Sequence, residues 1–187
     1  MLAAMFQSVT PRTAGFNTVN LDARMLTPAA AFLLMILMYI GGSPGSTAGG
    51  IKTTTLGLMI GSIAATLRGR SRVELFHHSV SEELVHRVTS IIVLSVGALA
   101  AAVFCLLMTE QGASFQAIVF DSISAFGTVG LSQGLTGAQT ELTAFGRLVI
   151  TGLMFIGRLG PITLVLSVAA LKDRAVYRYP EDQVLVG

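Results

Sequence analysis

Long apolar runs separated by short polar stretches make up most of the chain. The long runs cover residues 26–40, 56–67, 88–108 and 142–171, and the third of them holds 21 positions without a charge. About 20 apolar residues are enough for a helix to cross a bilayer. Residues 1–12 and 115–126 are also apolar but too short to cross. The pattern predicts an all-α integral membrane protein in which spanning helices alternate with short re-entrant helices.

One spanning segment is interrupted by residues 41–55, which read GGSPGSTAGGIKTTT. Backbone that leaves a helix at membrane depth exposes N–H and C=O groups that lipid cannot satisfy. Such a break is tolerated only against other protein or along a water-filled path. Broken helices therefore point to a permeation pathway.

Composition and charge support a membrane protein and give it an orientation. Of the 187 residues 52% are hydrophobic and 12% charged, whereas soluble domains carry about 25% charged residues. The net charge of +2 is too small for a nucleic-acid surface. Basic residues gather in residues 68–87 and in the tail, while residues 109–146 contain no Lys or Arg. By the positive-inside rule the loop and the tail are expected in the cytoplasm.

The sequence repeats itself weakly. TAGF at 13–16 matches TVGL at 128–131 at an offset of 115, and FQSV at 6–9 matches FDSI at 120–123 one residue out of step. YIGG at 39–42 matches FIGR at 155–158. Both halves thus run from a short helix through a T-x-G loop to a long helix. This order is typical of a pore helix, a filter loop and an inner helix, preceded by an outer helix.

A cation filter needs backbone carbonyls that replace the ion's water, and glycine gives the backbone the freedom to present them. Short pore helices also direct their partially negative C-terminal ends toward the cavity. Either T-x-G motif alone could be an ordinary turn, but two copies in the same context favour a filter. The expected carbonyl ligands belong to Thr13, Ala14, Gly15, Phe16, Thr128, Val129, Gly130 and Leu131.

Arg158 lies within the last apolar run, where an intramembrane Arg costs about 2.5–3.5 kcal/mol on insertion scales. It therefore needs acceptors, and the repeat alignment puts it level with Gly42. We expect it to bind carbonyls of the glycine loop; the alternative is a structural tie between helices. Asp121 in the second short helix could attract cations, or could simply hydrogen-bond nearby backbone.

Lys52 suggests a different function. GSTAGGIKTT resembles a phosphate-binding loop, but Ile51 separates glycine from lysine and no strand is expected before it. A nucleotide-binding enzyme is therefore disfavoured. Lys52 is expected to pair with carbonyls or with a carboxylate near the cytoplasmic side.

Four segments together resemble the last two pore repeats of the Trk/Ktr/HKT potassium transporter superfamily: PRTAGFNTVN, GGSPGSTAGGIKTTT, SAFGTVGLSQGLT and FIGRLGPITL. The terminal YPEDQVLVG resembles the end of a Ktr-type pore subunit. The resemblance implies uptake of K⁺ across the plasma (inner) membrane by a multi-pass protein that is not an enzyme. It also implies filter glycines at Gly15 and Gly130. The residues implied in an intramembrane gate are Gly41, Gly42, Ser43, Gly45, Ser46, Thr47, Gly49, Gly50, Lys52 and Arg158.

The same resemblance implies partners. These are membrane lipid, a second copy in a homodimer, and a cytoplasmic ring of nucleotide-binding regulatory subunits, with no nucleic acid. K⁺ is the transported ion, Na⁺ is left open as a coupling ion, and no covalently bound cofactor is implied.

The implied division of the chain has two repeats. The third pore repeat, lacking its outer helix, covers 1–68, and the fourth covers 88–171. Within them we expect a pore helix at 1–12, a filter at 13–17, an interrupted inner helix at 25–68, a cytoplasmic loop at 69–87, an outer helix at 88–109, a pore helix at 114–126, a filter at 127–131, an inner helix at 142–171 and a cytoplasmic tail at 172–187.

The family has four such repeats, so half of the filter is expected from missing N-terminal pore repeats. The alternative is a non-conducting membrane fragment that dimerises or binds the regulatory ring.

Overall fold

The structure, a computed structural model, describes residues 2–18, 21, 26–69, 73–75, 78–136 and 142–160. Helices dominate this part of the chain, as the hydrophobic pattern predicts, and one antiparallel pair of two-residue strands joins them. The elements are α1 (Leu2–Val9), α2 (Pro28–Tyr39), α3 (Thr53–Leu67), β1 (Glu74–Leu75), β2 (His78–Ser79), α4 (Glu82–Thr109), α5 (Phe115–Phe126) and α6 (Ala144–Leu159).

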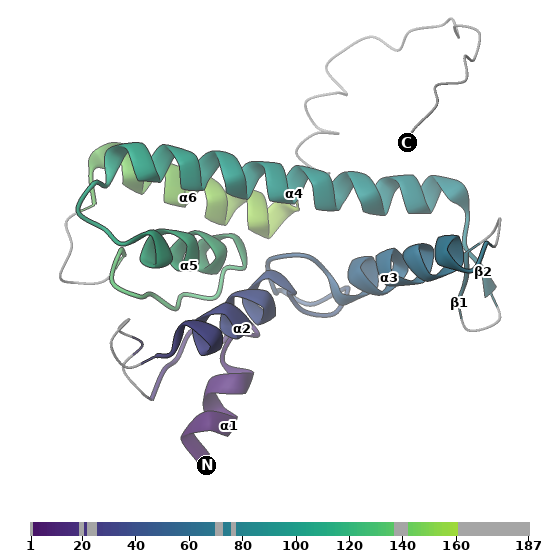
Figure 1. Cartoon of the computed structure of the whole chain (residues 1–187), viewed down its shortest axis with the longest axis horizontal. Coiled ribbons are helices and arrows are strands. Elements are labelled where there is room, and N and C mark those ends of the chain that lie inside the picture. The colour runs from purple at the N-terminus through teal and green to yellow at the C-terminus, as the bar shows by residue number, and fades with distance from the viewer. Residues whose placement is uncertain are drawn as a thin grey trace, which may run out of the picture.

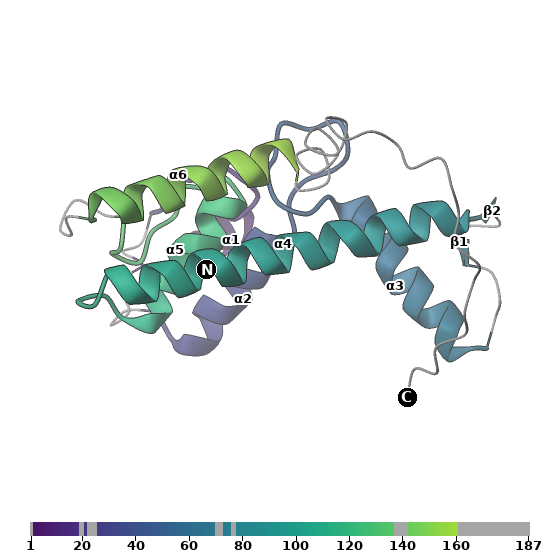
Figure 2. The ribbon, with the colours of Figure 1, turned by 90° about the horizontal axis from the view of Figure 1, so that it is seen from above.

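The long helix α4 organises the rest (Figure 1). α5 and α6 pack against its C-terminal half and against each other, and α3 packs along its N-terminal half. Figure 2 shows α6 running beside α4. α2 packs on α5, and α1 projects away from the body (Figure 1). The segment between α2 and α3 lies below the last turn of α6, so the interrupted helix and the last helix meet there.

Local sequence explains where several helices begin. Thr27 accepts a hydrogen bond from the Ala30 N–H at 3.3 Å, with a proline in the first turn of α2. Ser114 caps α5 and Thr143 caps α6 in the same way. Hydroxyl caps satisfy backbone donors that the first turn of a helix leaves unpaired.

Three expected boundaries are wrong. The first pore helix was expected at 1–12, but α1 ends at Val9. The outer helix was expected at 88–109, with a loop before it, but α4 begins at Glu82. Two glutamates in its first turn stabilise this start, because their negative charges interact favourably with the positive N-terminal end of the helix dipole. The inner helix was expected at 142–171, but α6 ends at Leu159, and Gly160 has φ 84°. The tail at 172–187 lies outside the described residues.

The described core consists of two apolar clusters. The first joins α4, α5 and α6 around Leu106, Ile118, Phe126 and Leu153. The second joins α2 to the loop after α5: Met38 and Phe120 pack with Val129 and Leu131. The second cluster therefore binds the inner helix of one repeat to the T-x-G segment of the other.

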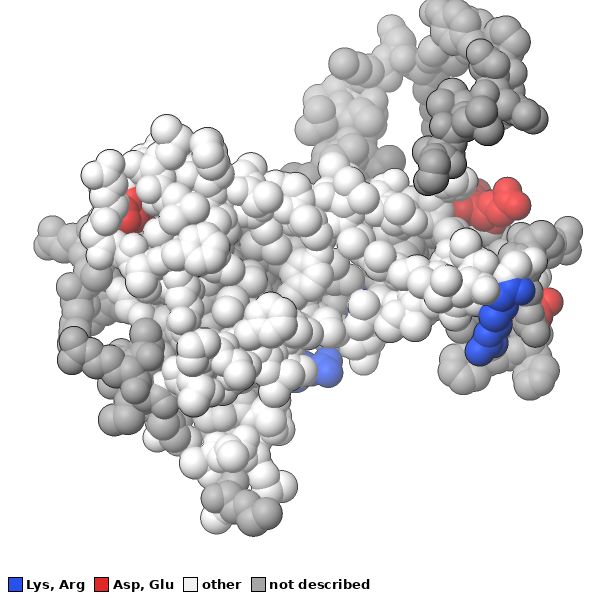
Figure 3. Space-filling model, in the orientation of Figure 1, with Lys and Arg blue, Asp and Glu red and all other residues white. Residues whose placement is uncertain are grey.

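The outer surface is largely apolar. Among the described residues only α4 is long and apolar enough to cross a membrane, at 28 residues and about 42 Å. Its Val93, Phe104 and Met108 are more than half exposed. On the face in Figure 3 the broad region between the two ends is mostly uncharged. A charge-free apolar surface is what lipid requires.

Candidate ion pathway

The two T-x-G segments have the same backbone pattern. Thr13 and Gly15 have φ values of 63° and 75°, and Thr128 and Gly130 have φ values of 51° and 90°. The residue between each pair is not left-handed. In a strand successive residues face opposite sides, whereas alternating left- and right-handed residues can bring successive carbonyls to one side. Each left-handed threonine is an unusual conformation that costs about 1–3 kcal/mol and needs its surroundings to hold it.

Each segment is tied to its short helix by a corresponding hydrogen bond. The Ala14 N–H donates to the Thr10 carbonyl at 3.1 Å, and the Val129 N–H donates to the Ser124 carbonyl at 2.9 Å. The donors are 115 residues apart and the acceptors 114. One extra residue between helix and loop in the second copy thus explains why the repeats are out of step.

The segments meet at their glycines. A Cβ on Gly15 would overlap the Val129 carbonyl oxygen, whereas a Cβ on Gly130 would lie 3.8 Å from the Gly15 Cα. Glycine at 15 is therefore required by both its φ and its surroundings, and glycine at 130 by its φ alone.

The two T-x-G segments differ in their burial and in the side chains that hold them. Val129 and Leu131 are each 3% exposed, while Phe16 is 73% exposed. The first segment has a hydroxyl support, since Thr10 Oγ1 donates to the Phe16 carbonyl. That carbonyl therefore already has one partner in the structure.

Asp121 supports the second segment from within α5. It is 2% exposed and accepts four hydrogen bonds from the loop that follows Leu131. Of the two roles weighed from the sequence, binding nearby backbone is the one these contacts describe. The sequence could suggest a buried carboxylate here but could not identify its donors.

The glycine-rich segment forms a loop with a closed neck. The Gly41 N–H donates to the Ile51 carbonyl at 2.8 Å, and the Ile51 N–H donates to the Tyr39 carbonyl at 3.1 Å. Thr53 N–H to the Gly42 carbonyl adds a third bond at 3.2 Å. Beyond the neck Ser43 and Gly45 are exposed.

Three cationic side chains donate to carbonyls of this loop. Arg158 Nη1 donates to the Thr47 carbonyl, as its position predicted. Lys52 Nζ donates to the Ala48 carbonyl at 2.7 Å and to the Ser46 carbonyl at 3.2 Å. Arg12 Nη1 donates to the Gly41 carbonyl at 3.1 Å. The contact of Arg12 could not be predicted, because its position before a T-x-G loop does not reveal a partner 29 residues away.

The C-terminal end of the loop contacts the start of the second T-x-G segment and the end of α6. A Cβ on Gly49 would lie 2.5 Å from Thr128 Oγ1 and 2.9 Å from the Gly127 carbonyl oxygen. The Gly50 N–H donates to the Gly157 carbonyl at 3.3 Å. The loop, the last turns of α6 and the residues just before Val129 therefore form one contact.

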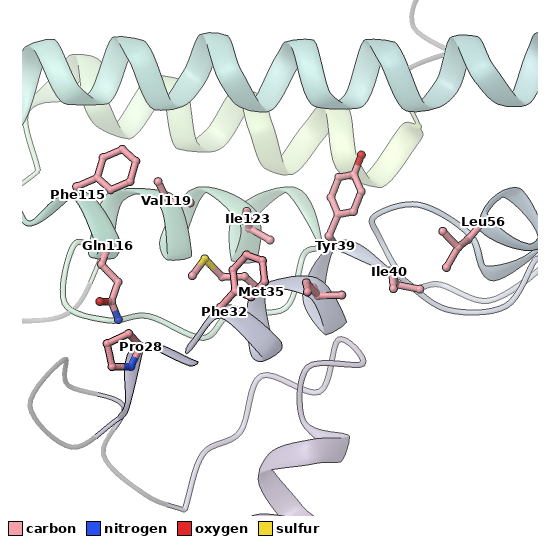
Figure 4. Close-up of a pocket in the computed structure, with 11 residues that line it drawn as sticks. Pro28, Phe32, Met35, Tyr39, Ile40, Leu56, Phe115, Gln116, Val119 and Ile123 are labelled. Carbon is pink, nitrogen blue, oxygen red and sulfur yellow. The ribbon is translucent and has the colours of Figure 1, made fainter. Parts of the chain in front are cut away.

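Other hollows offer less for an ion. A groove of about 690 Å³ between α2 and α5 is lined almost entirely by apolar side chains (Figure 4). Its Tyr39 hydroxyl points toward α4 and bonds Ser95 Oγ at 2.9 Å. Within the described ranges no group of three His, Cys, Asp or Glu side chains could hold a metal. Lys52 already binds its own loop's carbonyls, which disfavours a phosphate site there.

The sequence matches the family described as TrkH, cation transport protein, over residues 1–178. It is 41% identical over 187 residues to the potassium/sodium uptake protein NtpJ of Enterococcus hirae, covering 97% of this chain and 40% of that protein. It is 42% identical over 185 residues to the Ktr system potassium uptake protein B of Bacillus subtilis, covering 99% of this chain and 40% of that protein. The chain thus spans about two fifths of the length of these relatives.

A solved structure has the same fold. The potassium transporter TrkH from Vibrio parahaemolyticus matches with a TM-score of 0.74 and 20% sequence identity, over 88% of this chain and 36% of that one.

Proposed function

The chain belongs to the TrkH family of cation transport proteins, and on this premise we propose that it supplies two filter segments and a gating loop to a potassium-uptake pore. The observation that carries the proposal is the pair of T-x-G segments. They share left-handed residues at matching positions and lie against each other at their glycines. Nothing about an ordinary turn calls for the same strained threonine twice.

In this proposal K⁺ is the substrate and backbone carbonyls of the two segments replace its water. They belong to residues 13–16 and 128–131. The carboxyl-terminal end of α5 faces the second segment through Gly127, which adds a partial negative charge. The relatives' names speak of potassium and sodium uptake, and Na⁺ is a second ion to test as substrate or coupling ion.

The loop of residues 41–50 is the gate. Three cationic side chains hold its carbonyls, and its Gly49 lies against Thr128, the first residue of the second filter segment. A loop held in this place obstructs a single-file path, and releasing its carbonyls allows it to move aside.

The division into a third and a fourth repeat belongs to the same proposal, as do the assembly partners. Further pore repeats complete the filter, a second copy forms a homodimer, and a cytoplasmic nucleotide-binding ring regulates the gate. The protein is a membrane transporter and not an enzyme, with the 69–87 region and the tail in the cytoplasm.

Uptake of radioactive Rb⁺ by cells that lack their own K⁺ uptake tests the proposal. The chain is expressed with the N-terminal three fifths of a Ktr uptake protein that completes it. We expect saturable Rb⁺ uptake that K⁺ competes away and that neither part gives alone. Stable assembly in the membrane without uptake of any cation would instead favour the non-conducting fragment.

A further inference from the structure

Asp121 forms a contact that the proposed function does not explain. The carboxylate lies in the middle of α5, and every partner comes from the five residues that follow the filter. Oδ1 accepts the Gln133 N–H at 2.7 Å. Oδ2 accepts the Ser132 hydroxyl at 2.6 Å, the Thr136 N–H at 2.8 Å and the Thr136 hydroxyl at 2.9 Å.

Asp121 is the acceptor in all four hydrogen bonds, as an ionised carboxylate must be. Two partners are backbone N–H groups, which can only donate, and the Ser132 oxygen itself accepts the Gly134 N–H at 3.0 Å, leaving its hydrogen for Asp121. Hydrogen bonds to a charged acceptor are shorter and stronger than neutral ones. Both oxygens are used, so the loop is held by its backbone and by its side chains.

The filter segment is therefore fixed at both ends. On the helix side the Gly127 N–H donates to the Ile123 carbonyl at 2.8 Å and the Val129 N–H donates to Ser124. On the far side Asp121 holds residues 132–136. Asp121 and Gly130 also line the same cavity of about 410 Å³.

The residue of the first repeat that matches Asp121 is Gln7, and within the part of the chain that the structure describes its side chain does not hold the loop after its filter segment in this way. Its amide nitrogen and oxygen are buried with no hydrogen-bond partner among the described residues. An amide has one acceptor oxygen, so it could not accept at both branches as a carboxylate does.

We propose that Asp121 is the positioning residue of the second filter segment, and that it sets cation selectivity by fixing the carbonyls of residues 128–131. This inference rests on the proposed function. A filter discriminates between ions by the spacing and field of its carbonyls, so a looser segment accepts Na⁺ more readily. The action is mechanical, through the held loop, and not the attraction of the charge for the ion.

The test measures K⁺, Rb⁺ and Na⁺ uptake in the completed transporter, normalised to its abundance in the membrane. Asp121→Asn keeps the shape and removes acceptor capacity. The matched control is Glu110→Gln, because Glu110 also accepts a backbone N–H and a hydroxyl, both from Thr143, away from the filter. We expect Asp121→Asn to lower the K⁺/Na⁺ uptake ratio at least about tenfold, with no change of ratio for Glu110→Gln. An unchanged ratio in Asp121→Asn overturns the proposal.

Two further variants distinguish a role of Asp121 in holding the loop from a direct effect of its charge on the ion. Ser132→Ala with Thr136→Val removes two donors and keeps the carboxylate, and it also serves if Asp121→Asn fails to accumulate. Asp121→Glu keeps the charge on a longer arm. A mechanical role predicts a lower ratio in both, whereas an unchanged ratio in both means that the charge acts through space and overturns the proposal.

Hydrogen exchange gives a readout that does not need transport. In Asp121→Asn the amides of Gln133 and Thr136 should exchange at least about tenfold faster, while that of Val129, which donates to Ser124, changes less. If the parent takes up no cation, the proposed function fails, and these rates still decide whether Asp121 holds the loop. Unchanged rates overturn the holding itself.

Discussion

The two T-x-G segments, residues 13–16 and 128–131, have left-handed residues at the same positions, but very different contacts hold them in place. Val129 and Leu131 of the second segment are buried against α2 and α5, and Asp121 holds the loop that follows them. The first has a more exposed surface and a single hydroxyl bond from Thr10. The same local motif, T-x-G, therefore occurs with two different sets of supporting contacts. Backbone conformation thus follows the motif, whereas rigidity depends on the contacts each repeat builds around it.

The loop of residues 41–50 also contacts the two segments differently. Its Gly49 lies against Thr128, and its Gly50 bonds the helix that follows the second segment. Next to the first segment, Arg12 donates to the Gly41 carbonyl at the other end of the loop. In the proposed function, the more firmly held segment is therefore the one next to the gate, and we expect its contacts to keep gate movement from distorting its carbonyls.

The largest expected effect comes from serine at the two filter glycines. Gly15→Ser introduces a Cβ at positive φ and an overlap with the Val129 carbonyl oxygen, so we expect selective uptake to be lost. Gly130→Ser has room for the Cβ and only the φ strain, about 1–2 kcal/mol. It should retain uptake with a weaker preference for K⁺ over Na⁺.

The measurement is Rb⁺ and Na⁺ uptake in K⁺-starved cells carrying the completed transporter, with membrane abundance determined in parallel. Unchanged K⁺ affinity and discrimination in Gly130→Ser would remove that segment from the filter. Equal losses in the two variants would contradict the difference in their surroundings.

Arg158→Ala is expected to have an intermediate effect. Removing the donor to the Thr47 carbonyl frees the loop, so basal flux should rise. Deleting residues 45–50 should also raise flux. The two changes should not add, because residues in one network couple by about 0.5–3 kcal/mol.

A double-mutant cycle on flux, normalised to membrane abundance, checks this. Strict additivity, together with loss of protein from the membrane, would leave Arg158 as a structural tie between helices.

The smallest expected effect comes from Thr10→Val, which removes the one hydroxyl support of the first segment while keeping its shape. A single neutral hydrogen bond contributes about 0.5–1.5 kcal/mol. The K⁺/Na⁺ ratio should therefore fall only a few-fold, less than in Asp121→Asn. A larger change in Thr10→Val would reverse the ranking of the two segments.

Sequence reasoning succeeded where one local signal decides the structure. The glycine-rich run predicted the break between α2 and α3, and an unpaired arginine inside an apolar run predicted that Arg158 needs a partner among nearby carbonyls.

The rest depends on residues brought together only by folding. Arg12 reaches Gly41, Gly49 meets Thr128, and Asp121 holds residues 132–136 across distances that no local periodicity encodes. The start of α4 was misjudged because charged residues were read as loop, although glutamates suit the first turn of a helix. The left-handed threonines had no sequence signal, since threonine rarely adopts that conformation.

In the proposed function the two T-x-G segments bind a cation through their carbonyls. Anomalous scattering from Rb⁺-soaked crystals of the completed transporter tests it most directly. We expect a Rb⁺ peak between residues 13–16 and 128–131, on the side to which their carbonyls point, that weakens when K⁺ replaces Rb⁺. A well-ordered pair of segments with no peak between them, and Rb⁺ bound elsewhere in the molecule, would contradict it.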